Sequence, residues 1–232
     1  MYTKSGVSGM AYANTFQRME IKYLLTSQQT EAVLQKISGF MIEDEYSCQT
    51  ICSLYCDSPD DILARISLDK PVYKEKLRLR AYGTPTDSSP VFLEIKKKYD
   101  GVVYKRRVST DFAQAMRFLT EGIPPESGDY VARQVTAEMT HMIRRDGLIP
   151  AVFYDRRAFH SADDPELRLT LDGNIRYRLG DLDLRNGTDG DTIPGQPFRI
   201  MEIKSASSIP LWLASTLSEL GIHPGSFSKY GS

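Results

Sequence analysis

Polar and apolar residues alternate with a period of two through much of this chain. Such alternation, in runs rich in Val, Ile, Tyr and Phe and bounded by Gly, Pro, Asp and Ser, predicts β-strands. Asp100–Gly101 lies between two of these runs and predicts a tight hairpin. The predicted strands are Phe16–Leu24, Tyr46–Cys56, Tyr73–Tyr82, Val91–Tyr99, Val102–Thr110, Ala151–Phe159, Leu167–Leu171, Ile175–Arg178 and Phe198–Lys204.

Four other segments follow the helical period. In Thr26–Ile37, Thr26 is a predicted N-cap with Gln29 three residues later, and the segment ends before a glycine. Many strands, joined mostly as hairpins, and few helices predict an α+β fold built on an antiparallel sheet. We expect this sheet to close into a barrel, because closure removes exposed edges. The other predicted helices are Asp111–Glu121, Asp129–Arg145 and Pro210–Leu220.

Basic residues occupy the polar face of several predicted strands. In Tyr73–Tyr82, the alternate positions from Lys74 to Arg80 are basic and share one face, while Leu77 and Leu79 lie on the other. The same alternation places on one face of their strands Arg18, Glu20 and Lys22; Glu94, Lys96 and Lys98; Lys105 and Arg107; Tyr154 and Arg156; Arg168, Thr170 and Asp172; and Glu202 and Lys204.

One strand of this kind is typical of a sheet whose polar face meets solvent. Several in one chain favour charged faces that converge on one another. Like charges on neighbouring strands destabilise a sheet, and burying unpaired charges is costly. A ligand with many negative charges would supply the missing counter-charge. Residues two apart on a strand lie about 6.6 Å apart, so one strand is able to contact successive phosphates of a linear chain.

Acidic residues are interleaved with the basic ones on the same predicted faces. Glu20, Glu94, Asp172 and Glu202 compensate part of the positive charge. Carboxylate oxygens of this kind suit Mg²⁺ or Mn²⁺. The chain has no Gly-rich phosphate loop followed by Lys and Ser/Thr, no dinucleotide-binding glycine motif and no nucleophile elbow.

Composition limits which partners and which cellular compartment are expected for the protein. The 232 residues carry a net charge of -1, which gives no global attraction to nucleic acid or to an anionic membrane. No apolar run is long enough to span a membrane, and residues 1–15 look like a flexible lead-in without a secretion signal. Cys48, Cys52 and Cys56 do not form a disulfide framework. Reduced thiols and absent signals predict a cytoplasmic protein.

Seven short motifs occur in a recognisable order along the chain. Together they resemble the catalytic domain of the vacuolar transporter chaperone (VTC) polyphosphate polymerases, in the triphosphate tunnel metalloenzyme (CYTH-like) superfamily. The match extends from about Phe16 to Tyr230, which implies a single domain over residues 16–232. The motifs are Arg18-x-Glu20-x-Lys22-Tyr23, Leu77-Arg78-Leu79-Arg80-x-Tyr82-Gly83, Glu94-Ile95-Lys96, Tyr154-Asp155-Arg156-x-Ala158-Phe159, Leu167-Arg168-x-Thr170-Leu171-Asp172, Glu202-Ile203-Lys204 and Phe227-Ser228-Lys229-Tyr230.

The resemblance implies a closed barrel of eight antiparallel strands with flanking helices, whose inner basic residues bind phosphates. It implies catalytic roles for Lys22, Arg78, Arg80, Lys96, Arg156, Glu202 and Lys229. It implies substrate-binding roles for Lys76, Lys105, Arg107, Tyr154, Arg168, Lys204 and Ser228. It implies that Mn²⁺ or Mg²⁺ binds at Glu202, and the shared strand face adds Glu20 as a second candidate ligand.

The chain departs from the superfamily pattern in two respects. Arg18 stands where the hydrolytic branch has the first glutamate of Glu-x-Glu-x-Lys, which favours the polymerase branch. The chain also lacks the SPX regulatory domain and the membrane helices of the eukaryotic polymerases. We therefore expect a compact bacterial form with no membrane partner and no nucleic-acid partner.

Three hypotheses follow for the activity. The first is a polyphosphate polymerase that transfers the γ-phosphate of ATP to a growing inorganic polyphosphate chain. The second is an inorganic triphosphatase or nucleoside triphosphatase with the same tunnel, and the third is a non-catalytic module that binds polyphosphate. The sequence leaves open the physiological donor and acceptor, the choice between Mn²⁺ and Mg²⁺, and the oligomeric state.

Overall fold

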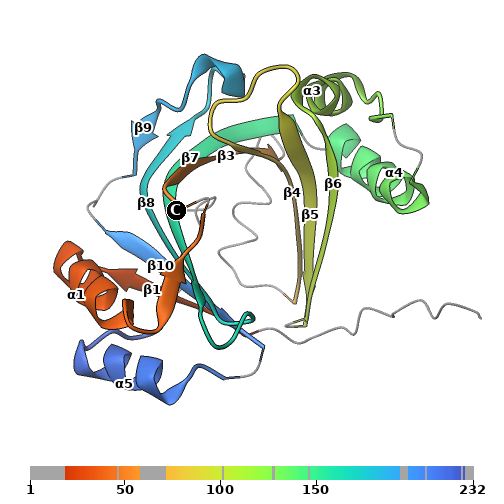
Figure 1. Cartoon of the computed structure of the whole chain (residues 1–232). Helices are drawn as coiled ribbons and strands as arrows, with labels where there is room; N and C mark the ends of the chain where they lie inside the picture. The colour runs from red at the N-terminus through yellow and green to blue at the C-terminus, as the bar shows by residue number, and fades with distance from the viewer. Residues whose placement is uncertain are drawn as a thin grey trace, which may run out of the picture.

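A curled antiparallel sheet forms the body of the protein in the computed structural model (Figure 1). The structure describes residues 19–45, 47–57, 72–100, 102–126, 129–145, 147–193, 198–206, 208–225 and 227. The strands of the sheet are β1 (Met19–Leu25), β2 (Met41–Glu43), β3 (Gln49–Asp57), β4 (Tyr73–Tyr82), β5 (Pro90–Tyr99), β6 (Val102–Asp111), β7 (Gly147–Ser161), β8 (Arg168–Arg178), β9 (Asp191–Thr192) and β10 (Arg199–Ser205).

Eight strands follow one path in the order β1-β10-β8-β7-β3-β4-β5-β6, and every pair is antiparallel. The short strands β2 and β9 lie off this path and pair with β7 and β8. The path divides into two walls that face each other across the curl. We call β1, β10, β8 and β7 the first wall, and β3, β4, β5 and β6 the second wall.

The predicted closure of the barrel is wrong, because the sheet is open between β1 and β6. Within the described residues, β1 pairs only with β10 and β6 pairs only with β5. The contact across the opening is an ion pair in which Lys96 Nζ lies 4.0 Å from Glu20 Oε2, rather than a backbone ladder. Lys22 on one edge and Lys105 on the other both face the curl, and like charges oppose close pairing of those edges.

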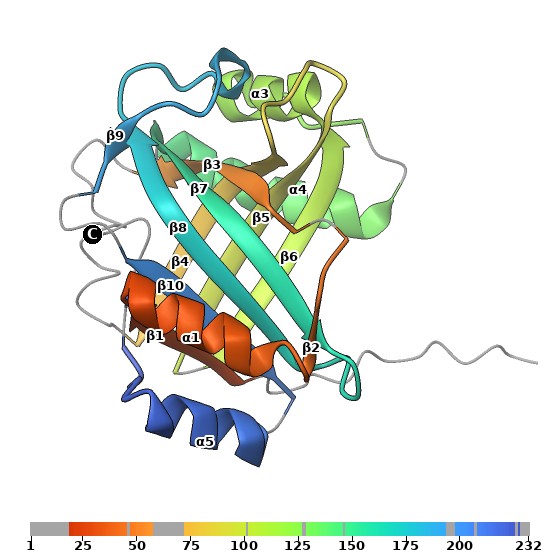
Figure 2. The same cartoon turned by 60° about the vertical axis from the view of Figure 1, so that its left-hand side comes forward.

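Within the described part of the chain, four α-helices cover the convex side of the sheet (Figure 2). Helices α3 (Phe112–Glu121) and α4 (Tyr130–Arg145) pack on the second wall, where apolar residues such as Leu79, Leu93 and Phe118 are buried. Helices α1 (Ser27–Ile37) and α5 (Leu211–Glu219) lie beside the first wall. Burial of the apolar strand faces under helices leaves the polar faces toward the inside of the curl.

Local sequence signals fix the predicted helix ends. Thr26 caps α1 in a capping box with Gln29, as predicted. Asp111 caps α3 by accepting a hydrogen bond from the Gln114 amide, and Gly122 ends the helix with a left-handed φ of 74°. Among the described residues, no helix combines the length and apolar character needed to cross a membrane.

The predicted strands Leu167–Leu171 and Ile175–Arg178 are parts of one strand, β8. Asn174, with a φ of 50°, interrupts the alternation inside it, and the pairing with β7 shifts register between Phe153 and Asp155. The alternation of side chains therefore changes at this point although the backbone continues. The short strands β2 and β9 and the 3₁₀ helix η1 (Leu184–Asn186) were not predicted from the sequence.

Candidate functional site: the concave face of the sheet

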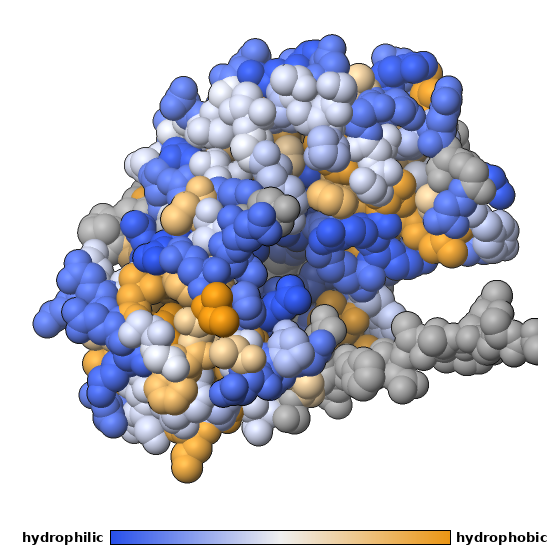
Figure 3. Space-filling model, in the orientation of Figure 1, coloured by the Kyte–Doolittle hydropathy of each residue, from blue (hydrophilic) through white to orange (hydrophobic). Residues whose placement is uncertain are grey.

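The register of the strands brings the predicted basic residues to one concave face. On the second wall, Arg78 lies opposite Glu94, which in turn lies opposite Arg107. On the first wall, Lys22 lies opposite Glu202, and Arg156 lies opposite Asp172. Figure 3 shows hydrophilic residues gathered around the hollow between the two walls. The charged residues that alternate along the individual strands thus lie together on one surface.

Glu94 is the centre of the second wall and is almost fully buried, with 1% of its side chain exposed. Its Oε2 atom accepts a hydrogen bond from Arg78 Nε at 2.8 Å, and Arg78 Nη2 lies 2.7 Å away. Its Oε1 atom lies 2.7 Å from Lys105 Nζ and 2.9 Å from Arg107 Nη2. Burial raises the pKa of Glu94, but Arg78, Arg80 and Lys105 outweigh burial and lower this pKa to about 2.

Two tyrosines hold the arginines of this wall from the other side. Arg78 Nη1 donates a hydrogen bond to Tyr55 Oη at 3.2 Å, and Arg80 Nη2 donates one to Tyr154 Oη at 3.1 Å. Burial raises the pKa of Tyr55, but Arg78 and Arg80 outweigh burial, so this pKa is about 8. Sequence reasoning proposed Tyr154 and missed Tyr55, although Tyr55 alternates with Ser53 and Ile51 on the concave face of β3.

Lys76 and Lys105 extend the basic surface of the second wall. Burial, together with neighbouring Lys74 and Lys22, lowers the pKa of Lys76 to about 8, although Tyr55 raises it in part. Burial also lowers the pKa of Lys105 to about 8, although Glu94 raises it in part. Both ammonium groups therefore titrate close to neutral pH, in contrast to an exposed lysine.

On the first wall, a bidentate pair fixes one arginine. Arg156 donates from Nε to Asp172 Oδ1 at 2.6 Å and from Nη2 to Asp172 Oδ2 at 2.7 Å, and the Asp172 side chain is completely buried. Toward the opening, Lys204 Nζ lies 2.8 Å from Glu202 Oε1. A guanidinium held by both oxygens of a buried carboxylate keeps one orientation.

The C-terminal segment returns to this wall. Lys22 Nζ donates a hydrogen bond to the carbonyl oxygen of Phe227 at 3.5 Å, and the Gly225 amide donates to the carbonyl oxygen of Lys22 at 2.8 Å. Phe227 packs edge-on against Phe198, with ring centroids 5.4 Å apart. The predicted site residues Ser228 and Lys229 lie outside the described residues, as does Arg18.

The remaining predicted residues are less buried. The side chains of Lys96, Lys105, Arg107 and Lys204 are 44%, 40%, 45% and 42% exposed. Arg168 is exposed and lies opposite Lys204 in the sheet. Lys96, Lys105 and Arg107 lie on β5 and β6 of the second wall, whereas Lys204 and Arg168 lie on β10 and β8 of the first wall.

Five buried side-chain atoms on strands of the sheet have no hydrogen-bond partner within the described part of the chain: Arg80 Nε, Ser53 Oγ, Thr170 Oγ1, and the Nε atoms of Arg176 and Arg178 near the end of β8. Arg80 Nε is the most informative, because its side chain is 8% exposed and the nearest carboxylate oxygen, Glu94 Oε2, is 3.9 Å away. A buried cationic donor without an acceptor is costly. An anion that reaches Arg80 would remove this cost.

An apolar cluster limits the charged surface. Ile51, Val152, Ile175 and Ile200 are buried together beside Tyr55 and Tyr154. Phe198 and Phe227 pack against the same cluster. The inside of the curl therefore has a polar part suited to an anion and an apolar part that packs on itself.

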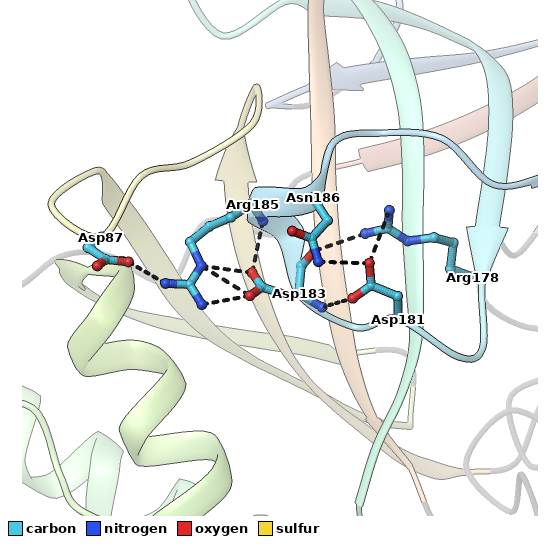
Figure 4. Close-up of polar contacts among 6 residues, drawn as sticks. All are labelled: Asp87, Arg178, Asp181, Asp183, Arg185 and Asn186. Atoms are coloured by element: carbon cyan, nitrogen blue, oxygen red, sulfur yellow. Dashed lines mark hydrogen bonds and ion pairs between the residues drawn. The ribbon is translucent and has the colours of Figure 1, made fainter.

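Charged residues outside the concave face are paired locally (Figure 4). After β8, Arg185 donates hydrogen bonds to Asp183 and to Asp87, the second with Nη1 at 2.6 Å from Oδ1. Arg178 Nη2 donates to the carbonyl oxygen of Asp183, and Asp181 accepts from Asn186. This cluster attaches η1 to the loop between β4 and β5. Its three aspartates outnumber its two arginines, unlike the mainly basic concave face.

The candidate donors for a divalent cation are Glu20 and Glu202 on adjacent strands. Their side chains are 35% and 9% exposed, and both face the curl. The described residues hold no group of three or more His, Cys, Asp or Glu side chains suited to a metal ion. Mg²⁺ is often held by one or two carboxylates together with phosphate oxygens of the substrate. The donor set at Glu20 and Glu202 fits that mode of binding.

The chain belongs to the VTC domain family, whose model matches residues 17–232. The family predicted from the sequence motifs is therefore confirmed.

Solved structures share the fold at low sequence identity. A putative adenylate cyclase from Bacillus halodurans superposes with a TM-score of 0.57 at 13% identity, over 90% of this chain and 92% of that chain. A putative adenylyl cyclase from Hippeastrum, reported to have a dominant triphosphatase activity, gives a TM-score of 0.52 at 16% identity, over 92% and 93% of the two chains. No curated protein matches the chain significantly.

Proposed function

We propose that this protein is a metal-dependent polyphosphate polymerase, which transfers the γ-phosphate of ATP to the end of an inorganic polyphosphate chain. The observation that carries the proposal is the excess of basic donors on the concave face, with Arg80 Nε buried and lacking an acceptor within the described residues. Membership of the VTC domain family supports the same substrate class.

In the proposed reaction, a terminal oxygen of the acceptor phosphate attacks the γ-phosphorus of ATP. The bond from the γ-phosphorus to the bridging oxygen breaks, and ADP leaves with the negative charge. Arg78, Arg80 and Lys105 would neutralise charge on the transferred phosphoryl group. The acceptor oxygen is already ionised, so no side chain has to remove a proton from it.

The basic residues at the opening and on the first wall would align donor and acceptor in line. Lys22, Lys96 and Arg156 face this space, with Arg156 held by Asp172. Alignment of two reactants in one site supplies a large part of the rate enhancement of such reactions. Mn²⁺ or Mg²⁺ held at Glu202 and Glu20 would neutralise phosphate charge when bound.

A second candidate function is hydrolysis of triphosphate, with water in place of the acceptor phosphate. The shared fold with the Hippeastrum protein, which is reported to have triphosphatase activity, favours it. The replacement of a glutamate by Arg18 favours the polymerase, because it removes one carboxylate from the superfamily metal motif.

Product length distinguishes the candidates. Purified protein would be incubated with ATP and Mn²⁺, with and without a short polyphosphate primer, and the products resolved on a gel. We expect a ladder of long chains with one ADP released per phosphate added. Free phosphate without chain growth would establish the hydrolase. Binding of polyphosphate without turnover would establish a binding module instead.

The metal site is tested by Glu202→Gln. We expect metal-dependent turnover to fall by about 100-fold or more, because a ligand of the cation is lost. Binding of tripolyphosphate without metal should persist, since the basic residues remain. Glu219→Gln is the matched control. Glu219 pairs with Lys36 on the exposed surface of helices α5 and α1, outside the concave face. Full turnover in Glu202→Gln would remove Glu202 from metal binding.

A further inference from the structure

Glu94 differs from the other carboxylates of the concave face in how it is surrounded. Both of its oxygens are engaged by basic groups: Oε2 by two nitrogens of Arg78, and Oε1 by Lys105 and Arg107. Arg80 Nε is 3.9 Å from Oε2. Glu20 and Glu202 form ion pairs with lysines at the opening of the curl, and Glu202 also interacts electrostatically with Arg156.

This environment argues against a metal at Glu94. A divalent cation would have to displace basic groups from both oxygens and then remain beside four positive side chains. The Coulomb repulsion among close charges in a buried site is large. The same environment favours an anion next to the cluster, because four basic groups share one carboxylate.

We propose that Glu94 is a positioning residue of the phosphate site: its carboxylate fixes the guanidinium groups of Arg78 and Arg107 and partly neutralises the second wall until a phosphate chain binds. The inference deepens the proposed function and rests on it for the identity of the ligand. Arg78 is then held on two sides, by Glu94 at Nε and Nη2 and by Tyr55 at Nη1, with its remaining N–H bonds available to phosphate.

The consequence is that Glu94 opposes binding and assists turnover. Its negative charge lies beside the phosphate position and weakens the attraction for an anion. Its hydrogen bonds hold the arginine fork in one orientation, which a transferring phosphoryl group requires. A residue that acts only through folding would not separate these two effects.

The test compares Glu94→Gln with Glu75→Gln. Glu75 lies on the neighbouring strand β4, on the opposite face of the sheet, where Tyr73 and Lys97 contact it. For Glu94→Gln we expect metal-free tripolyphosphate to bind about three- to tenfold more tightly, because one negative charge is removed. We expect kcat to fall about 10- to 100-fold, because the fork loses its fixed orientation. Glu75→Gln should change neither value.

A fall in affinity together with kcat, or no change in either, would overturn the proposal. A variant whose only defect is a raised requirement for Mn²⁺ would instead make Glu94 a metal ligand and also overturn it. If the wild-type protein turns over no phosphate chain, the proposed function fails, but the binding comparison still tests Glu94.

If the wild-type protein binds no tripolyphosphate either, sulfate provides an independent readout. Glu94→Gln leaves the basic cluster without its counter-ion, so its melting temperature should rise more with added sulfate than that of the wild type or of Glu75→Gln. Equal increases in the three proteins would overturn the role of Glu94 as counter-ion.

Discussion

Tyr55 lies where burial and charge act in opposite directions on one side chain. Burial alone disfavours the ionised phenol, whereas Arg78, Arg80 and Lys76 favour it. The effect of the positive groups is larger than that of burial, so the pKa of Tyr55 is about 8 rather than near 10. The balance shows how strongly positive the second wall is, even with Glu94 in its centre.

Absorbance at 295 nm as a function of pH should therefore show one tyrosine ionising near pH 8, apart from the other tyrosines. This step should be missing in Tyr55→Phe. Because the pKa is lower in the folded than in the unfolded protein, the wild type gains stability relative to Tyr55→Phe as pH rises from about 8 to 10. An unchanged titration in Tyr55→Phe would contradict the assignment.

The lowered pKa values of Lys76 and Lys105 predict that phosphate binding weakens as pH rises. Both pKa values are about 8, so both ammonium groups lose protons as pH rises above 8, and Tyr55 gains negative charge. Above pH 8, an anion therefore binds well only if these two lysines and Tyr55 take up protons. We expect the dissociation constant of tripolyphosphate to rise about tenfold per coupled proton between pH 7 and 9.

Isothermal titration calorimetry without metal would measure this dependence. In Lys76→Met, binding should be weaker at pH 7 and its pH dependence should decrease by about one proton. A dissociation constant that stays constant from pH 7 to 9 would show that neither lysine titrates in this range.

At the scale of elements, β8 carries two functions along its length. Its first part supplies Thr170 and Asp172 to the concave face, and its last part pairs with the short strand β9. Asn174 separates the two parts with its left-handed backbone. The approach of β9 is close: a Cβ at Gly190 would lie 2.6 Å from the carbonyl oxygen of Tyr177.

Gly190→Ala should therefore destabilise the protein by about 1–3 kcal/mol, because backbone atoms have to move apart. Gly180→Ala is the control: its added Cβ would have no heavy atom within 4 Å. Chemical denaturation of both variants measures the difference in the free energy of unfolding. Equal stability of the two variants would show that β9 does not pack closely on β8.

At the scale of the whole molecule, charge is segregated although the net charge is only -1. Basic groups gather inside the curl, while on the outside acidic groups such as Asp87 and Asp183 pair with Arg185. The two walls are joined by backbone pairing of β7 with β3, whereas at the opening the described residues of β1 and β5 meet through side chains, where Lys96 lies near Glu20. Exposed pairs of this kind contribute little stability.

Hydrogen exchange tests the open sheet. Amide groups of β6 that face away from β5 should exchange rapidly, whereas those of β4, which is paired on both sides, should exchange slowly. Full protection along both β1 and β6 in the ligand-free protein would mean that the edges pair and that the barrel is closed.

The long strands other than β8, the helix caps and the faces that carry charge could be predicted from the sequence, whereas the short strands β2 and β9 and the continuity of β8 could not. The predicted features are local: a period of two decides which residues share a face, and Thr26 and Asp111 cap the helices that follow them. The order of the short motifs was also sufficient to predict the VTC domain family. The residues of the concave face could therefore be named before their contacts were known.

Only the tertiary structure decided how those residues meet. The register and curl of strands far apart in the chain bring Arg78 into contact with Glu94 and Tyr55. They also determine that the edges of the sheet stay open. Alternation predicts which face of the sheet a side chain occupies but not which residue it contacts. The sequence therefore could not show that Tyr55, among the tyrosines of the strands, binds an arginine of the site. Closure depends on the balance between backbone pairing and repulsion at two distant edges, and no local pattern contains that balance.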